Sequence, residues 1–288
     1  AHYVTAFVVS GGAAASGAAA SGAAASGLFS ALSLFQDLAL IVAVVAFFFK
    51  LRLYDEIKDY EVDCEINRDR PLVRGLVNHG DLYRGIALCI ALELICFFFL
   101  GYQALSAMVF SLLYSLLMYK EFFIGEKLRP YLTTYAVMHT IVCSFLSLSI
   151  FSALTEKYVF ELSRDLLFFS LNCWFLFNIF EFGRKTFTTA EERENVESYS
   201  NIFGRYGAVA LVLAMALASG GLLIHSDLAG GGVFKWVIAA FDIVLLLFGM
   251  AYALLDRTPF GMLYRGMSSG YIILVLGSIV LLYQLDKL

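Results

Sequence analysis

The sequence contains few charged residues. Only 15% of its 288 residues are charged and 60% are hydrophobic, whereas roughly a quarter of the residues in soluble domains are charged. The sequence also lacks a CxxC pair, and four of its five cysteines lie in apolar runs, where a thiol usually packs as a small hydrophobic side chain. This composition predicts an integral membrane protein, and it implies no disulfide framework, no zinc site and no nucleic-acid partner.

Long apolar runs separated by short polar stretches make up most of the chain. A helix needs about 20 apolar residues to cross a bilayer. We predict spans at 30–53, 83–101, 104–119, 131–153, 163–182, 205–225, 233–255 and 262–285, with a weaker first span at 1–20. The expected fold is an all-α, polytopic membrane bundle of about nine transmembrane helices, in a single domain over residues 1–288. The Gly/Ala/Ser repeat at 11–27 supports no functional inference.

Basic residues are distributed unevenly between the connections. Sixteen of the 20 lysines and arginines follow the second, fourth, sixth and eighth predicted spans. Because basic residues accumulate in cytoplasmic loops, we expect these connections to face the cytoplasm and the N-terminus to lie outside. A chain with nine spans then has its two termini on opposite sides.

The segment from Leu53 to Gly75 carries the most informative polar pattern. Asp55, Asp59 and Asp63 recur every four residues, so on a helix they lie one turn apart on one face. Such a column of carboxylates repels itself unless cations bridge it. Mg²⁺ is a natural partner, because it combines one or two carboxylates with water and phosphate oxygens. The alternative is that a helix leaving the membrane simply becomes polar.

Basic residues follow the aspartates closely. Arg68 and Arg70 are candidate phosphate ligands, and Pro71 with Gly75 predicts a defined turn after the helix. Residues that can bind a metal cation and residues that can bind a phosphate anion therefore occur in one segment, as a site for a metal diphosphate requires.

A second polar cluster extends from residue 181 to residue 200 and is predicted on the same membrane face. We expect the two clusters to converge in a helical bundle, each supplying part of a binuclear metal site. The alternative is an ordinary solvated loop. The candidate metal ligands are Glu181, Glu191, Glu192 and Glu194, and the basic residues beside them are Arg184 and Lys185.

Three further polar residues are candidates of lower specificity. Lys120 and Arg129 follow the fourth predicted span and are possible phosphate ligands, although anchoring at the membrane surface explains them equally well. His139 lies within an apolar run, where we expect it to pack against a neighbouring helix.

The segment from Asp55 to Pro71 resembles the first signature of the UbiA superfamily of intramembrane prenyltransferases. That signature has an Asn or Asp followed by two Asp at four-residue intervals, and then Arg-Pro eight residues after the last Asp. Here these positions are Asp55, Asp59, Asp63 and Arg70-Pro71. The family's bundle of nine helices, with conserved loops on the cytoplasmic side, is similar to the layout predicted above.

The resemblance implies a Mg²⁺-dependent site in which a prenyl diphosphate ionises and an acceptor captures the carbocation. Asp55, Asp59 and Asp63 would hold metal. The sequence departs from the family's second signature, DxxxD, because it has no aspartate between Asp165 and Asp227. The four glutamates named above are the available substitutes, with Lys185 four residues after Glu181 as a further catalytic candidate.

Three functions remain open on the sequence. The main expectation is transfer of a prenyl group from a prenyl diphosphate to a lipophilic or aromatic acceptor within membrane lipids. The divergent second signature also suggests a subgroup that includes terpene cyclases, which need no acceptor. A cation-binding transporter is the non-enzymatic alternative; intramembrane acids would favour it, but the acidic clusters are predicted at one membrane face.

Overall fold

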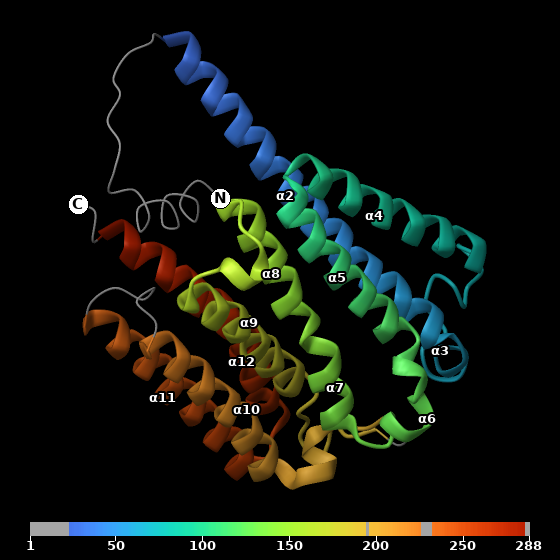
Figure 1. Ribbon diagram of the computed structural model, residues 1–288. Helices are drawn as coiled ribbons and strands as arrows, with labels where there is room; N and C mark the ends of the chain where they lie inside the picture. The colour runs from blue at the N-terminus through green and yellow to red at the C-terminus, as the bar shows by residue number, and fades with distance from the viewer. Residues whose placement is uncertain (1–22, 194–195, 226–231, 286–288) are drawn as a thin grey trace. The chain divides into compact units, whose positions relative to one another are not determined.

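The computed structural model describes residues 23–193, 196–225 and 232–285, and every element in these ranges is a helix. Eight spans are long and apolar enough to cross a membrane (Figure 1). They are Leu34–Lys58, His79–Phe99, Tyr102–Tyr119, Leu132–Thr155, Arg164–Arg184, Tyr199–His225, Gly232–Leu255 and Thr258–Leu282. The all-α polytopic fold is confirmed. The weaker predicted span at 1–20 lies outside the described residues.

The chain divides into two compact units, residues 1–123 with 145–162 and residues 124–144 with 163–288. The boundary falls inside one predicted span, which the structure forms from two helices, α7 (Leu132–Thr140) and α8 (Val142–Thr155). The expectation of a single domain stays a prediction.

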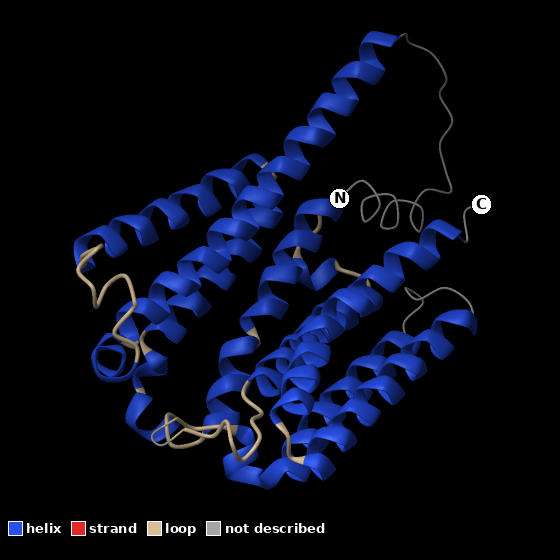
Figure 2. Cartoon of the chain, turned by 180° about the vertical axis from the view of Figure 1, so that it is seen from behind, coloured by secondary structure: helices blue, strands red, loops and turns tan. Residues whose placement is uncertain are grey.

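The first unit is built around a long helix, α2 (Ala23–Lys58), that packs along α4 (His79–Phe99) (Figures 1 and 2). A short helix, α3 (Tyr60–Ile66), follows α2 directly. The unit also contains α5 (Tyr102–Tyr119), η1 (Glu121–Phe123), the second part of α8 and η2 (Val159–Glu161). Buried apolar residues from α2, α4 and the turn between them form its local core.

Gly101 separates two spans that the hydropathy pattern alone divides poorly. Its φ of 113° is favourable for glycine and strained for other residues, so α4 ends before it and α5 begins after it. The predicted division between the spans at 83–101 and 104–119 is therefore confirmed.

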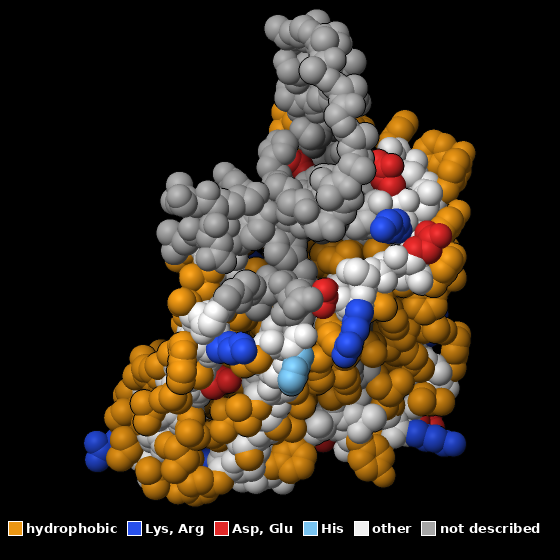
Figure 3. All heavy atoms as spheres, turned by 60° about the vertical axis from the view of Figure 1, so that its left-hand side comes forward, with side chains coloured by type: hydrophobic (Ala, Val, Ile, Leu, Met, Phe, Trp, Pro, Cys, Tyr) orange, Lys and Arg blue, Asp and Glu red, His pale blue; other side chains and the backbone are white. Residues whose placement is uncertain are grey.

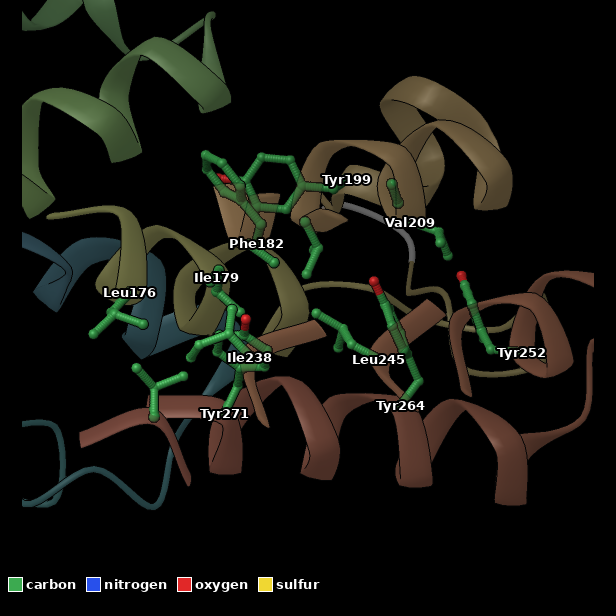
Figure 4. Packing of buried hydrophobic residues seen from close by; sticks show 14 of the residues in the cluster. Leu176, Ile179, Phe182, Tyr199, Val209, Ile238, Leu245, Tyr252, Tyr264 and Tyr271 are labelled. Carbon is green, nitrogen blue, oxygen red and sulfur yellow. The ribbon is translucent and has the colours of Figure 1, made fainter. Parts of the chain in front are cut away.

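The second unit contains α6 (Gly125–Leu128), α7, α9 (Arg164–Arg184), α10 (Tyr199–His225), α11 (Gly232–Leu255) and α12 (Thr258–Leu285). Figure 4 shows its core, to which α9, α10, α11 and α12 all contribute. The rings of Tyr252 and Tyr264 stack with centroids 5.3 Å apart, and those of Phe182 and Tyr199 meet edge to face at 4.9 Å. This core fixes the ends of the helices that carry the second polar cluster.

Large apolar side chains are exposed along the spans. Phe99, Leu247 and Ile273 are each more than 60% exposed, and hydrophobic side chains cover much of the described surface in Figure 3. Such surfaces are stable in lipid and not in water, because lipid tails are as apolar as the side chains themselves. The protein is an integral, multi-pass membrane protein.

Candidate functional site

Asp55, Asp59 and Asp63 lie on three successive helical turns at the end of α2 and in α3. The backbone N–H of Asp59 donates to the carbonyl oxygen of Asp55 at 2.9 Å, and that of Asp63 donates to the carbonyl of Asp59 at 2.8 Å. The helical hydrogen bonds therefore continue across Asp59, where α2 ends and α3 begins. The structure has the one-turn spacing that the sequence predicts for the three carboxylates.

The three carboxylates differ in their surroundings. Asp63 is buried; its Oδ1 accepts a hydrogen bond from Asn67 Nδ2 at 2.7 Å, and its Oδ2 lies 3.6 Å from Arg70 Nε. Asp55 and Asp59 are exposed. Within the ranges that the structure describes, no three Asp, Glu, His or Cys side chains are grouped closely enough to hold a metal ion by themselves.

The carboxylates nevertheless fit the chemistry of Mg²⁺. This ion usually takes one or two protein carboxylates and fills its other positions with water and phosphate oxygens. Asp55 and Asp59 are exposed, hard oxygen donors one helical turn apart. A metal at this position would therefore depend on oxygens from a bound diphosphate for part of its coordination.

The turn after α3 brings Arg70 back to the acidic helix end. The backbone N–H of Arg70 donates to the carbonyl of Asn67 at 3.0 Å, and Gly75 supplies the positive φ of 70° that the turn needs. Leu72 is buried in the local core and anchors the turn. Arg68, the other predicted phosphate ligand of this segment, is exposed.

Glu56 is a residue of this site that sequence reasoning missed. It is buried at the end of α2, and its Oε2 accepts hydrogen bonds from Arg52 Nη2 at 2.8 Å and from Arg70 Nη1 at 3.4 Å. Glu56 and Asp63 are seven residues apart and so lie on one side of the helix. That spacing was visible in the sequence, but the contact with Arg70 depends on the turn.

At the end of α9, Glu181 contacts both predicted phosphate ligands of the second cluster. Arg184 Nη2 lies 2.6 Å from Glu181 Oε2, and Lys185 Nζ lies 2.8 Å from Oε1. These are contacts at three and four residues along one helix end, where such pairs meet. The structure thus brings one candidate metal ligand together with two candidate diphosphate ligands.

Glu191 is held by a residue from α12. Arg265 Nη1 donates to Glu191 Oε2 at 3.0 Å and Nη2 donates to Oε1, while the Thr188 hydroxyl and backbone N–H also donate to Oε2. The hydrogen bonds from Arg265, reinforced by those from Thr188, lower the pKa of the Glu191 carboxyl to about 2. Arg265 lies 74 residues further along the chain, so no local sequence pattern predicts this pair.

Further hydrogen bonds stabilise the connection between α9 and α10, which contains Glu191. Glu192 accepts hydrogen bonds from the hydroxyls of Ser198 at 2.7 Å and Ser200 at 2.6 Å. Thr189 donates from its backbone and its hydroxyl to Asp256, and these bonds lower the pKa of that carboxyl. The connection between α9 and α10 is therefore tied to the helices of its own unit.

The remaining predicted residues are Lys120, Arg129, His139 and Glu194. Lys120 is exposed, with its Nζ 5.0 Å from the centroid of the Tyr119 ring, and Arg129 is exposed after α6. Glu194 lies outside the described residues. The ring of His139 stacks on Tyr135 of the same helix, α7, with centroids 3.9 Å apart, and packing of His139 against a neighbouring helix stays a prediction.

Glu93 and Asp242 are acidic side chains inside spans, as is the buried Asp37 of α2, and the sequence pattern predicts no acidic site there. Glu93 in α4 forms a 2.6 Å ion pair with Lys50 in α2, and both side chains are fully buried. Asp242 in α11 accepts a hydrogen bond from the Tyr271 hydroxyl at 2.5 Å. Glu93 and Asp242 each have a protein partner on a neighbouring helix, as polar groups in membrane interiors usually do.

The predicted residues fall into two sets. Asp55, Asp59, Asp63, Arg68, Arg70 and Lys120 belong to the first unit, and Arg129, Glu181, Arg184, Lys185, Glu191 and Glu192 belong to the second. Convergence of the two sets on one site stays a prediction.

Comparison with known proteins places the chain in a family. The family model for the UbiA prenyltransferase family matches residues 9–260, which include both polar clusters and most of the spans. No curated protein and no solved structure matches the chain. Because the matched region covers most of the sequence, the chain belongs to the UbiA prenyltransferase family.

Proposed function

We propose that this protein is a Mg²⁺-dependent intramembrane enzyme that ionises a prenyl diphosphate and transfers the prenyl group to a lipophilic or aromatic acceptor. Family membership already implies an intramembrane activity of the prenyltransferase type. The main support for the metal-dependent transfer reaction is that three aspartates occupy successive turns at the end of a membrane span, with Arg70 close to Asp63.

Asp55, Asp59 and Asp63 are the proposed metal-holding residues of the first unit. A bound Mg²⁺ would neutralise the negative charge that grows on the departing diphosphate. Arg68, Arg70 and Lys120 are the proposed diphosphate-binding residues on this side, since guanidinium and ammonium groups bind phosphate oxygens well.

Support for the second cluster is strongest at Glu181. Its two ion-pair partners, Arg184 and Lys185, are themselves proposed diphosphate ligands. A proposed metal ligand and two proposed diphosphate ligands therefore lie together at this helix end. Glu191 and Glu192 already accept several hydrogen bonds within their loop. Glu191, Glu192 and Glu194 stay in the proposed set, and Arg129 completes the proposed phosphate ligands.

The reaction breaks the bond between the allylic carbon and the diphosphate oxygen, and the electron pair leaves with the diphosphate. The donors of Lys185 and the arginines stabilise that charge as it forms. The apolar spans exclude water from the cation until the acceptor attacks and loses a proton. We place this chemistry at the cytoplasmic face, because most basic residues follow the even-numbered predicted spans.

Diphosphate release tests this proposal directly. Purified protein incubated with Mg²⁺ and prenyl diphosphates of several chain lengths should release diphosphate. Asp59→Ala should lower the rate by about 100-fold or more, the scale for loss of a charge-stabilising group, while the protein stays folded in detergent. Asp69→Ala, an exposed aspartate of the same segment, is the matched control and should keep its rate. Full activity in Asp59→Ala would contradict the metal assignment.

The divergent second signature keeps the cyclase as a second candidate. Mass spectrometry of products formed without any added acceptor separates the two reactions, because a cyclase forms a terpene hydrocarbon or alcohol alone. The transporter alternative has less support, since Glu93 and Asp242 each have a protein partner inside the spans. Absence of release with every chain length, together with cation flux in liposomes, would favour the transporter.

A further inference from the structure

Two arginines share one buried carboxylate at the membrane-exit end of α2. We infer that Arg52 and Arg70 form a paired subsite for the phosphate oxygens of the substrate, and that Glu56 is the positioning residue that holds the pair. This inference rests on the proposed function. It adds Arg52 and Glu56, which neither the aspartate signature nor the sequence pattern singles out.

The contacts converge on a single atom. Glu56 Oε2 accepts from Arg52 Nη2 at 2.8 Å and from Arg70 Nη1 at 3.4 Å. Arg52 lies one turn before Glu56 on α2, whereas Arg70 reaches it from the turn 14 residues later. The two guanidinium groups are therefore close neighbours, although they come from separate segments.

The unused N–H donors of this cluster suit it to an anion. The two guanidinium groups share the Glu56 carboxylate, and Asp63 Oδ2 lies 3.6 Å from Arg70, so the cluster offers phosphate oxygens accessible donors and not an excess of positive charge. Each guanidinium has five N–H donors, and Glu56 uses few of them. The side chains of Arg52 and Arg70 are 46% and 34% exposed, so donors remain accessible. Paired guanidinium forks match the oxygens of a phosphate.

Burial of Glu56 distinguishes this cluster from an ordinary surface ion pair. Its side chain is 9% exposed, and among the described residues its second oxygen, Oε1, is buried with no hydrogen-bond partner. A buried acceptor without a partner is rare in folded proteins and asks for an explanation. A half-exposed ion pair along a helix stabilises little by itself, so stability alone does not explain the arrangement.

The position of Arg70 links the pair to the aspartates. Its Nε lies 3.6 Å from Asp63 Oδ2, beyond the length of a good hydrogen bond. Arg70 thus lies between Glu56 and a proposed metal-holding carboxylate. A diphosphate bound by the arginine pair would have its oxygens near Asp63, one of the residues that would hold Mg²⁺, and such oxygens could supply the coordination positions that protein carboxylates leave open.

Binding of inorganic pyrophosphate tests the subsite without turnover. Calorimetry in detergent with Mg²⁺ should give a Kd about tenfold or more weaker for Glu56→Gln and for Arg52→Gln, since each loses charge-assisted hydrogen bonds. Arg52→Lys should lose less than Arg52→Gln. KM for the prenyl diphosphate should rise in parallel, with a smaller change in kcat.

Matched controls come from the same unit. Glu61→Gln changes an exposed glutamate of α3, and Arg84→Gln changes an exposed arginine that pairs with Asp81 three residues away. Both should bind pyrophosphate as the unaltered protein does. Arg52 is half exposed, so Arg52→Gln decides the question if Glu56→Gln does not fold.

The outcomes separate this inference from the proposed function. Unaltered protein that neither binds pyrophosphate nor releases diphosphate would refute both. Pyrophosphate binding that is equal in the unaltered protein and in both variants would overturn only the arginine pair. A phospholipid headgroup offers the same phosphate chemistry, so binding is repeated in nanodiscs of phosphatidylcholine with and without phosphatidylglycerol. Loss of an anionic-lipid effect in Arg52→Gln, with pyrophosphate binding intact, would assign the pair to lipid and overturn the inference.

Discussion

Lys50 and Glu93 place a full ion pair inside the first unit. Their 2.6 Å contact joins α2 to α4, both side chains are fully buried, and Lys50 Nζ also lies 4.3 Å from the centroid of the Phe47 ring. A buried pair of this kind adds little stability over apolar residues, because desolvation of the two charges offsets their attraction. Removal of one partner is different, because it leaves the other charge buried and alone.

We expect Glu93→Leu to destabilise the protein by about 3–5 kcal/mol, the usual effect of breaking a buried pair. The double variant Lys50→Met/Glu93→Leu should recover most of that loss, since no unpaired charge remains. Thermal unfolding in detergent measures both. Arg84→Gln removes one partner of the exposed Asp81 pair and should change stability by less than about 1 kcal/mol. A double variant as unstable as Glu93→Leu would show that the pair itself stabilises the fold.

At the level of residues, the sequence predicted what depends on local spacing. The aspartates lie one turn apart because a helix fixes that spacing, and Lys185 contacts Glu181 for the same reason. The sequence did not predict the contacts of Glu191 with Arg265 or of Lys50 with Glu93. These pairs are separated by 74 and 43 residues, and their formation depends on how whole helices pack.

At the level of elements, the spans were predictable and their ends were not. The apolar core of each span drives its insertion into lipid, so all eight described spans match predicted ones. The observed helix ends differ from the predicted span ends because backbone hydrogen bonds can continue a helix beyond its apolar residues. Thus α2 extends to Lys58, and α10 begins at Tyr199 and turns at Gly204, whose φ is 69°.

The connection between α9 and α10 gives a pH-dependent prediction. The lowered pKa of Glu191 means that its ionised form is favoured in the folded loop. This contribution is fully present above the ordinary glutamate pKa of about 4.5 and is lost as the pH falls toward about 2. Asp256, which binds Thr189, has a lowered pKa and changes stability in the same direction.

We therefore expect hydrogen exchange in residues 185–193 to increase as the pH is lowered from about 5 toward 2, after correction for intrinsic exchange rates. Glu191→Gln should raise exchange at neutral pH and weaken this pH dependence, because the Arg265 pair is already lost. Glu197→Gln, which changes an exposed glutamate of the same connection, is the control and should leave both unchanged. An identical pH profile in Glu191→Gln and the unaltered protein would contradict this role for the carboxylate.

At the level of the whole molecule, each unit has its own core and its own share of the proposed ligands. The first unit holds the aspartates and the Arg52–Arg70 pair, and the second holds Glu181 with Arg184 and Lys185. The sequence predicts that both sets face the same side of the membrane, because the basic residues follow alternate spans. If the two sets share one site, as the sequence predicts, they should be energetically coupled.

Coupling can be measured with Asp63→Asn and Glu181→Gln, one variant from each unit. If both carboxylates serve one metal-diphosphate site, each variant alone should weaken binding of pyrophosphate with Mg²⁺. The double variant should then lose less than the product of the two separate losses, because the second change acts on a site already impaired. Asp69→Asn with Glu197→Gln, two exposed acids from the same segments, should show no loss and no coupling. Losses that simply multiply would mean that the two clusters bind their ligands independently, and the shared site would have to be abandoned.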